Sequence, residues 1–436
     1  MDFAQSLRYL DSLANFEKFT AYNYGRVYDL NRIFSLLAFL GNPQTQYPTI
    51  TVSGTKGKGS TVSILGSIFN SAGVQAGVLI SPHLLRVNER IRVGGRHISD
   101  SEFSLEVSVI RDIAARHGLK RLTYFEVITA AAFLYFWRKK VKIAVLEVGL
   151  GGRLDAVNTA RSLISAITPI SYDHTRLLGT SLKSIACEKC GIIHNNSYVV
   201  CARQPSEALL VVKSVASKKN ARLILAGRDI VISNAKTSLS GTCFDLKTRY
   251  DFYKKLHSPL IGLYQSANAA VAVSLAEAAR DRLDLNITKA AIRKGVAGVN
   301  FPGRFHLSFF QRRTVVLDGA QNAVSALALK GALKDIFGDR HICLILGVSS
   351  DKDYRGIAKI LCPVSRDIIF TQADTPRALP ASELARGAGL YLRKGFVCYD
   401  LIDAIGTAGA ITPMKGVIVI TGSLFLVSEA LRILNE

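Results

Sequence analysis

A glycine-rich turn containing lysine follows the first clearly apolar strand of the sequence. The segment reads Ile50-Thr-Val-Ser53-Gly54-Thr55-Lys56-Gly57-Lys58-Gly59-Ser60-Thr61 and leads into a predicted helix. Glycines let backbone N–H groups converge on phosphate oxygens, the helix N-terminus adds partial positive charge, and Lys58 can bridge the outer phosphates. The segment therefore predicts a phosphate-binding loop. The expected contacts are Gly54, Thr55, Gly57, Lys58, Gly59 and Ser60.

This loop differs from a regular Walker A sequence, because Gly59 stands where the magnesium-binding Ser or Thr would follow the lysine. Magnesium would then need other oxygen ligands, at the carboxyl ends of neighbouring strands. Glu147 ends the apolar run Ile143-Ala-Val-Leu146, as a Walker-B acid does, although a glutamate there can also cap a helix or form a salt bridge. Ser81 and the pair Asp173-His174 follow two other predicted strands and are expected at the same edge.

The elements that must position these residues alternate between short β-branched runs and longer helical stretches. This pattern is typical of a parallel sheet covered by helices on both faces. Between about Asp229 and Lys255 the pattern changes to short segments separated by turns, which predicts a small antiparallel insertion. The strands expected before the insertion are Thr49–Val52, Gly77–Ile80, Ile143–Glu147, Leu163–Thr168 and Tyr198–Cys201.

The alternation restarts after a Pro-Gly pair, Pro302-Gly303, where we place the domain boundary. Helices are expected from near Gln265 to about Arg280 and near Thr288–Gly295. The second domain lacks a Gly-x-Gly-x-x-Gly fingerprint after its first strand, which argues against a dinucleotide site there. The strands expected in it are Val315–Leu317, Ile342–Leu346, Ile368–Thr371 and Val417–Thr421.

Length and composition fit this two-domain α/β interpretation. The chain has 436 residues, which allows about two or three domains at roughly 150 residues each. Its composition is that of a soluble globular protein. We find no signal peptide and no run of about 18 apolar residues that would span a membrane. The seven cysteines are scattered and odd in number, which indicates a reducing compartment and hence the cytoplasm.

The net charge favours anionic ligands. Lys and Arg number 55 against 33 Asp and Glu, so the net charge is 55 − 33 = +22. Such a protein attracts nucleic acids or small polyanions, and a solvated basic surface without a specific role is the alternative. The basic residues are spread along the chain, without an RNP-like motif or zinc-finger spacing, which favours small polyanions over nucleic acid.

The order of motifs resembles the Mur ligase superfamily and, within it, the folylpolyglutamate and dihydrofolate synthases. The resemblance covers nearly the whole chain. Its motifs in the first half are Leu40-Gly-Asn-Pro-Gln44, Gly54-Thr-Lys-Gly-Lys-Gly-Ser60, Ser81-Pro-His-Leu84, Asn88-Glu-Arg-Ile91, Phe125-Glu126, Glu147-Val-Gly-Leu-Gly-Gly-Arg-Leu-Asp155, Asp173-His174, Leu178-Gly179 and Glu188-Lys189. Those in the second half are Gln265-Ser-Ala-Asn268, Pro302-Gly-Arg304, Asp318-Gly-Ala320 with Asn322, Asp351-Lys-Asp353 and Thr421-Gly-Ser-Leu424.

The resemblance implies an architecture. Residues 1–300 would form the ATP-binding, Mur ligase central-type domain, with a P-loop-type, doubly wound, mostly parallel sheet and the small antiparallel insertion. Residues 301–436 would form a smaller Rossmann-like α/β ligase domain. The ATP site would then lie in the cleft between the two domains.

The resemblance also assigns roles to residues. Lys58 and its loop would hold ATP phosphates, and Ser81, Glu147 and His174 would bind one or two Mg²⁺ ions. Lys189 would be the family's carbamylated lysine, since addition of CO₂ turns its ammonium into a carboxylate-like group that can help hold a metal. Gln265 and Asn268, on one face of a helix, would contact adenine. Arg304 and Asp318 would reach ATP from the second domain. The catalytic set is Lys58, Lys189, His174 and Arg304.

The sequence departs from the family pattern at several positions. Lys56 replaces a usual Asn in the phosphate loop, and Gln321 replaces a usual His after Asp318-Gly-Ala320, which places an ATP or glutamate contact in question. Cys187 and Cys190 form a C-x-x-C without a second pair at zinc spacing, and we interpret this as coincidence. Further departures are Tyr264 for His, Val157 for Thr and Cys190 for Ala.

The function implied is an ATP-dependent ligase that forms an acyl phosphate from a substrate carboxylate and ATP, which the amine of L-glutamate then attacks. The form of Ser81-Pro-His-Leu84 resembles that of family members which accept dihydropteroate as well as folates more than that of members restricted to folates, so the resemblance favours a bifunctional enzyme. We expect a monomer with small-molecule substrates and neither nucleic acid nor membrane as partner. Two alternatives remain at this point: another Mur-superfamily ligase, such as a peptidoglycan-precursor ligase, and a basic P-loop ATPase that acts on nucleic acid.

Overall fold

The chain divides into two compact units. The computed structural model describes residues 1–17, 29–389 and 395–435. The larger unit consists of Met1–Ala235, Cys243–Ser258 and Gln265–Val299. The smaller unit consists of Lys236–Thr242, Pro259–Tyr264 and Asn300–Glu436. Lys236–Thr242 and Pro259–Tyr264 thus group with the smaller unit, although both stretches precede residue 300 in the sequence.

The larger unit is built on a sheet of eight strands within the described residues, in the order β4-β3-β2-β5-β1-β6-β7-β8. The strands from β2 to β8 pair in parallel, whereas β3 and β4 add antiparallel pairs at one edge. The mostly parallel α/β sheet predicted from the sequence is confirmed. Its strands are β1 Thr49–Ser53, β2 Ala76–Leu79, β3 Ile91–Val93, β4 Arg96–His97, β5 Ile143–Glu147, β6 Ile164–Ile167, β7 Tyr198–Cys201 and β8 Arg222–Leu225.

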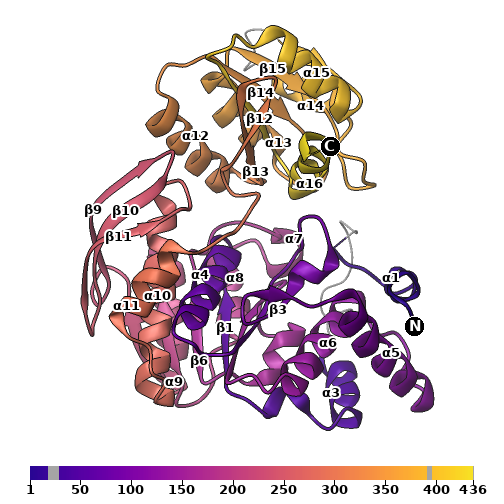
Figure 1. Ribbon diagram of the computed structural model, residues 1–436, viewed down its shortest axis with the longest axis vertical. Coiled ribbons are helices and arrows are strands. Elements are labelled where there is room, and N and C mark those ends of the chain that lie inside the picture. Colours follow the sequence, from indigo (N-terminus) through magenta and orange to yellow (C-terminus); the bar gives the residue numbers. More distant parts are fainter. Residues whose placement is uncertain (18–28, 390–394, 436) are drawn as a thin grey trace. The chain divides into compact units, whose positions relative to one another are not determined.

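Helices cover both faces of this sheet (Figure 1), and every residue of β1 and β5 is buried. The best buried helix, α6, begins with a capping box in which the Thr123 hydroxyl accepts from the Glu126 N–H. Parallel strands covered on both faces are expected to be continuously apolar, as β5 is up to its last residue, Glu147. The helices of this unit are α1 Phe3–Asp11, α3 Leu30–Phe39, α4 Lys58–Ser71, α5 Asp100–Arg116, α6 Tyr124–Arg138, α7 Thr175–Leu178, α8 Leu182–Cys190, α9 Ser206–Lys218, α10 Tyr264–Leu283 and α11 Lys289–Ala297, with 3₁₀ turns at Pro43–Thr45, Val87–Arg90 and Ala156–Ala160.

The insertion forms a separate three-stranded sheet within the described residues, in the order β11-β10-β9. Its strands are β9 Val231–Ser238, β10 Gly241–Lys247 and β11 Phe252–Ser258. Neighbouring strands joined by such short turns run antiparallel, because a parallel connection needs a much longer crossover. The change of pattern after Asp229 therefore predicted this element correctly.

The smaller unit has its own sheet and core. Its strand order is β12-β13-β17-β14-β15-β16, in which only β12 pairs antiparallel among the described strands. Apolar side chains of α12, α13 and α14 pack on this sheet around Leu344, Val419 and Phe370. The strands are β12 His306–Phe310, β13 Arg313–Asp318, β14 Ile342–Leu346, β15 Asp367–Phe370, β16 Gly395–Val397 and β17 Val417–Thr421. The helices are α12 Ala323–Phe337, α13 Tyr354–Leu361, α14 Ala381–Ala388, α15 Leu401–Ile411 and α16 Leu424–Asn435, with a 3₁₀ turn at Cys362–Val364.

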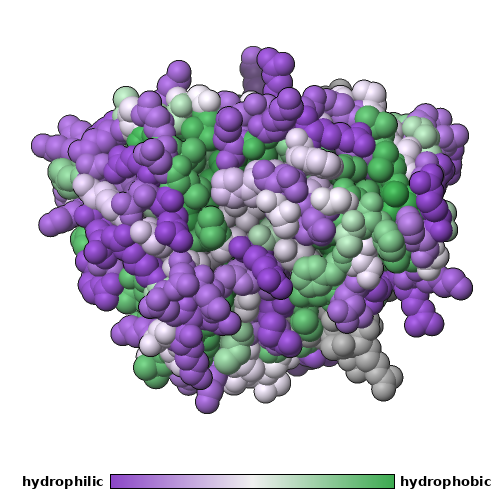
Figure 2. Space-filling model, turned by 90° about the horizontal axis from the view of Figure 1, so that it is seen from below, coloured by the Kyte–Doolittle hydropathy of each residue, from purple (hydrophilic) through white to green (hydrophobic). Residues whose placement is uncertain are grey.

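The surface is mainly polar. Hydrophilic side chains predominate on the face in Figure 2, and apolar areas lie between them. Single exposed apolar residues such as Leu210 are ordinary on a protein surface and need no functional explanation. Among the described residues, none of the helices combines the length and the apolar character needed to cross a bilayer.

Because β1 is buried, we expect its apolar side chains to contribute to the free energy of unfolding. Ile50 in β1 is fully buried, whereas Leu210 on α9 is 67% exposed. Ile50→Ala should lower the free energy of unfolding by about 2–5 kcal/mol because it removes buried methyl groups and leaves a cavity. Leu210→Ala should change it by less than about 0.5 kcal/mol. Urea denaturation followed by circular dichroism measures both. Equal effects of the two substitutions would contradict the placement of β1 in the core.

Candidate active site

The phosphate loop lies between β1 and α4 and contains two glycines in left-handed conformations. Gly54 has φ +143° and Gly57, the residue before α4, has φ +87°. A Cβ at Gly54 would overlap Thr168, and a Cβ at Gly57 would overlap the side-chain oxygen of Asn268. Both positions therefore require glycine for conformation and for space. The loop places the N-terminus of α4 at the carboxyl end of β1, and a helix N-terminus is a favourable site for phosphate.

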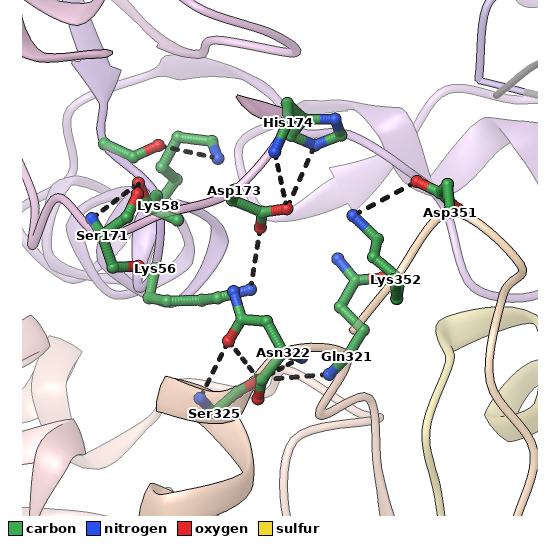
Figure 3. Close-up of polar contacts among 12 residues, drawn as sticks. Lys56, Lys58, Ser171, Asp173, His174, Gln321, Asn322, Ser325, Asp351 and Lys352 are labelled. Atoms are coloured by element: carbon green, nitrogen blue, oxygen red, sulfur yellow. Dashed lines mark hydrogen bonds and ion pairs between the residues drawn. The ribbon is translucent and has the colours of Figure 1, made fainter. Parts of the chain in front are cut away.

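The loop is clamped to the segment that follows β6. The backbone N–H groups of Thr55 and Lys56 both donate to the Pro169 carbonyl, at 3.0 and 3.2 Å. The Thr55 hydroxyl donates to the Ser171 carbonyl and accepts from the Ser171 N–H, each at 3.1 Å (Figure 3). These hydrogen bonds fix the loop against the segment after β6.

Three lysines gather at the loop: Lys56 and Lys58 belong to it, and Lys189 of α8 contacts it. Lys58 Nζ donates to the Gly54 carbonyl at 3.2 Å, and Lys189 Nζ donates to the same oxygen at 2.9 Å. Lys56 Nζ lies 3.3 Å from Asp173 Oδ2. The loop therefore combines backbone N–H groups with a concentration of cationic side chains, which suits a polyanionic phosphate group.

Lys189 is buried near the end of α8, and its position changes its acidity. Burial and, to a smaller extent, the neighbouring Lys58 ammonium lower the pKa of Lys189 to about 7, against the opposing charge of Asp173. A neutral amine is thus populated near pH 7. Helix α8 approaches the turn after β5 closely, since a Cβ at Gly152 would lie 2.8 Å from the Lys189 carbonyl oxygen.

The sheet order places the predicted metal ligands along the edge of the sheet that is formed by the carboxyl ends of its parallel strands. Ser81 follows β2, Glu147 ends β5, the phosphate loop follows β1, and His174 follows β6, and these strands are neighbours in that order. Glu147 is only 5% exposed, and its Oε2 accepts from the Ser81 N–H at 3.1 Å. The structure therefore brings Ser81 and Glu147 together, and it places His174 on the other side of the phosphate loop.

This donor set fits magnesium. Glu147 and Ser81 supply hard oxygen atoms beside the phosphate loop, which is the donor type that Mg²⁺ prefers. Within residues 1–17, 29–389 and 395–435, no cluster of three or more His, Cys, Asp or Glu side chains has the geometry of a metal site. A magnesium site here would accordingly depend on Ser81, on water and on phosphate oxygens in addition to Glu147 and His174.

Arg90 is a buried residue of this edge to which the sequence interpretation gave no role. Its Nη1 and Nη2 donate to the two carboxylate oxygens of Glu17 at 2.8 and 2.6 Å, and its Nε donates to His83 Nδ1 at 2.7 Å. Burial alone would lower the pKa of Arg90, but the Glu17 carboxylate outweighs burial and holds the pKa above its usual value. The signal for this residue was a charged side chain within the motif Asn88-Glu-Arg-Ile91.

Asp155 organises the glycine-rich turn after Glu147, a role that the sequence did not reveal. Its two carboxylate oxygens accept from the Leu150 N–H at 2.9 Å and the Val157 N–H at 3.0 Å. Burial raises the pKa of Asp155 to about 6 despite these bonds. The Ser53 hydroxyl donates to the Gly151 carbonyl at 2.8 Å, so the turn is also attached to the end of β1.

Gln265 and Asn268 lie together in the first turn of α10, as predicted. Asn268 Nδ2 donates to Gln265 Oε1 at 2.8 Å, and the side-chain oxygen of Asn268, Oδ1, faces Gly57. Gln265 is buried, and its Nε2 has no hydrogen-bond partner in the part of the chain that the structure describes. Buried donors are normally satisfied, so this group is suited to an acceptor on a ligand.

In the smaller unit, Arg304 and Asp318 lie close to each other. Arg304 Nη1 donates to the Gly303 carbonyl at 3.0 Å, and a Cβ at Gly319 would lie 3.0 Å from the same nitrogen. Asp318 ends β13 and accepts from the Phe305 N–H at 2.8 Å. Gln321 donates its backbone N–H to the Ser325 hydroxyl at 3.1 Å and precedes Asn322, the N-cap of α12 (Figure 3).

A second charged group in the smaller unit follows β14. Asp351 forms ion pairs with Arg377, at 2.8 Å, and with Lys352, at 3.6 Å. Burial opposes ionisation of Asp351, but Lys352 and Arg377 outweigh it and lower the pKa of this carboxyl. All three side chains are largely shielded from solvent, so the cluster is a fixed part of this unit.

Two family models match the chain. The Mur ligase middle domain matches residues 52–276, and the Mur ligase glutamate ligase domain matches residues 303–424. The first match contains the phosphate loop, Glu147, His174, Lys189 and Gln265. The second begins next to Arg304.

Curated relatives are similar over nearly the full length. The chain is 33% identical to the dihydrofolate synthase/folylpolyglutamate synthase of Bacillus subtilis, over 92% of this chain and 93% of that protein. It is 31% identical to the folylpolyglutamate synthase of Lacticaseibacillus casei, over 98% of this chain and 97% of that protein.

Solved structures have the same fold. Mycobacterium tuberculosis folylpolyglutamate synthase complexed with ADP matches with a TM-score of 0.91 and 30% identity, over 100% of this chain and 98% of that one. Escherichia coli FolC in complex with DHPP and ADP matches with a TM-score of 0.88 and 29% identity, over 100% and 98%. The chain therefore belongs to the Mur ligase superfamily and, within it, to the family of dihydrofolate synthases and folylpolyglutamate synthases.

Proposed function

We propose that this protein is an ADP-forming ligase that uses ATP to add L-glutamate to dihydropteroate, to reduced folates or to both. The observation that carries the proposal is the alignment of a clamped phosphate loop, Glu147 and Lys189 at one sheet edge, in a chain of this family. Neither the peptidoglycan-precursor ligase nor the nucleic-acid ATPase is favoured, because the curated relatives are dihydrofolate and folylpolyglutamate synthases.

The chemistry requires activation of a carboxylate. A free carboxylate repels nucleophiles, and its oxide is a poor leaving group. Transfer of the ATP γ-phosphoryl group gives an acyl phosphate and ADP, and attack by the glutamate amine then forms the amide and releases phosphate. The protein contributes positioning and charge neutralisation, which account for most catalysis of phosphoryl transfer.

Different residues of the larger unit would bind the phosphates, neutralise their charge and bind adenine. Gly54, Thr55, Gly57, Gly59 and Ser60 would present the loop to the phosphates, and Lys58 would leave the Gly54 carbonyl to neutralise the transferred group. The unpaired Gln265 Nε2, with Asn268 beside it, would bind adenine. In the smaller unit, Arg304 and Asp318 are the candidate ATP contacts, and Arg304 would add positive charge.

Magnesium, as one or two ions, would be held by Ser81, Glu147 and His174. When bound, Mg²⁺ supplies positive charge that offsets the charge of the phosphate oxygens. Lys189 would be carbamylated: its neutral amine would attack CO₂, form an N–C bond and release a proton. The low pKa of this buried amine supports the proposal, because only the unprotonated form is nucleophilic.

The acyl substrate is proposed from the relatives. The Bacillus subtilis relative carries both synthase names, and the Escherichia coli structure contains DHPP. We therefore propose that the protein has both synthase activities. We also propose that it is a monomer and that it acts in the cytoplasm. Mass spectrometry of the products formed from ATP, Mg²⁺, labelled glutamate and each candidate pterin tests the function. If none of the pterins gains a glutamate, the proposed function is refuted.

Lys58 provides the first test of the site. Lys58→Ala should reduce kcat/KM by at least about 10²-fold, the effect of removing one group that stabilises transition-state charge. The far-UV circular dichroism spectrum should be unchanged, because Lys58 contributes no core packing. Lys213→Ala, on the exposed face of α9, is the matched control and should retain activity. Near-normal turnover by Lys58→Ala would refute the assignment of the loop.

Two glycine substitutions separate backbone strain from ligand binding. Gly57→Ala and Gly73→Ala both introduce a Cβ at positive φ, +87° and +71°, but only Gly57 faces a neighbouring side chain. Each should destabilise the fold by about 1–2 kcal/mol. Only Gly57→Ala should also weaken ADP binding, by about 10-fold or more, since it displaces the loop and Asn268. Isothermal titration calorimetry measures the affinity, and equal affinities for the two variants would contradict this role of Gly57.

Carbamylation of Lys189 can be observed directly. In ¹³C-bicarbonate, the protein should show a carbamate resonance in its ¹³C NMR spectrum that is stronger at pH 8 than at pH 6. The sign follows from the pKa of about 7, because the amine is mainly neutral above this value and protonated below it. Lys189→Arg should lack the resonance and lose about 10²-fold or more in activity. A wild-type spectrum without the resonance at pH 8 would exclude carbamylation.

A further inference from the structure

Lys56 connects the phosphate loop to the segment that carries His174. Its Nζ lies 3.3 Å from Asp173 Oδ2, across 117 residues of sequence. The side chains of Lys56 and Asp173 are 24% and 9% exposed. An ion pair that is shielded to this degree is screened less by solvent than an ordinary surface pair.

The second oxygen of Asp173 acts on the next residue. Asp173 Oδ1 accepts from the His174 backbone N–H at 3.1 Å and lies 3.9 Å from His174 Nε2 (Figure 3). His174 has φ +50° and ψ +36°, in the left-handed region that is uncommon for residues other than glycine, and it is the N-cap of α7. The carboxylate of Asp173 thus supports a backbone conformation that requires local stabilisation.

Further hydrogen bonds join the same two segments before Asp173. Backbone and hydroxyl hydrogen bonds join Thr55 and Lys56 to Pro169 and Ser171. The next residue, Tyr172, is 56% exposed. Lys58 and Lys189 donate to the Gly54 carbonyl, at the start of the loop. The Lys56 side chain therefore extends the clamp from Ser171 to the residue that adjoins His174.

We propose that Lys56 is a positioning residue which, through Asp173, ties the phosphate loop to His174 and holds this imidazole at the carboxyl edge of β6 before nucleotide and Mg²⁺ bind. The inference rests on the proposed function, which makes His174 a magnesium ligand. Asparagine, the residue that the resemblance leads one to expect at this position, is shorter and uncharged, so it cannot form this ion pair. The tether is therefore a property of this chain's own sequence.

The test compares three substitutions with a control. Lys56→Asn removes the ion pair, Lys56→Arg retains a cation of similar reach, and Asp173→Asn removes the other partner. Lys213→Asn, on the exposed face of α9, makes the same change of type and charge away from the site. The first measurement is hydrogen–deuterium exchange of the ligand-free protein in the peptide covering residues 170–178, and the second is the affinity for AMPPCP with and without Mg²⁺.

Lys56→Asn and Asp173→Asn should each speed exchange in residues 170–178 by about 3- to 10-fold, the effect of losing one hydrogen bond of ordinary net strength. Both should weaken AMPPCP binding by a similar factor in the presence of Mg²⁺ and by less than about 2-fold in its absence. Lys56→Arg and Lys213→Asn should behave like the wild type. The double variant Lys56→Asn/Asp173→Asn should be no worse than either single variant, because both remove the same interaction.

Two outcomes would overturn the inference. Unchanged exchange in Lys56→Asn would show that the side chain does not hold the segment. Equal weakening of AMPPCP binding with and without Mg²⁺ would show that Lys56 contacts the phosphates directly. Failure of the proposed function is a separate result: a wild-type protein that does not bind AMPPCP or join glutamate to a pterin would refute that function, whereas the exchange comparison would still decide whether the tether exists.

Discussion

The order of four parallel strands is the constraint on which the candidate site depends. Because β2, β5, β1 and β6 are neighbours and run in the same direction, their carboxyl ends meet at one edge of the sheet. Glu147 is the last residue of β5, the phosphate loop and Ser81 follow β1 and β2 within two residues, and His174 lies in the segment after β6. Residues separated by almost a hundred positions thereby become neighbours, and ligands of α/β proteins bind at such edges.

Burial of charge at this edge explains why its groups are tied to one another. An isolated ion in the interior is costly, so buried charges are paired or hydrogen-bonded. Arg90 pairs with Glu17, Lys189 donates to a backbone carbonyl, and Asp155 accepts from backbone N–H groups. These contacts satisfy the groups and also fix the turns that carry the predicted metal ligands. Structural and catalytic requirements therefore act on the same residues.

Local patterns predicted the central strands, the insertion and the phosphate loop, because apolar runs and glycines act within a few positions of the chain. The sequence did not predict β4, which has only 2 residues, or β8, a four-residue strand at the end of the sheet order whose Arg222 and Leu223 are only partly buried. The pairing of Arg90 with Glu17 and of Lys56 with Asp173 could not be predicted either. Each joins residues far apart in sequence, which only the tertiary fold brings together.

Gln321 shows how a departure from the family pattern can leave the fold intact. The turn before α12 is held by the backbone N–H groups of Gln321 and Asn322, which both donate to the Ser325 hydroxyl, and by the Asn322 side chain, which accepts from the Ser325 N–H. Residue 321 contributes only its backbone to this cap. Histidine and glutamine are therefore equivalent for local structure, and the difference between them concerns the groups that the side chain can offer to a ligand. Imidazole can gain a proton near neutral pH, whereas an amide stays neutral.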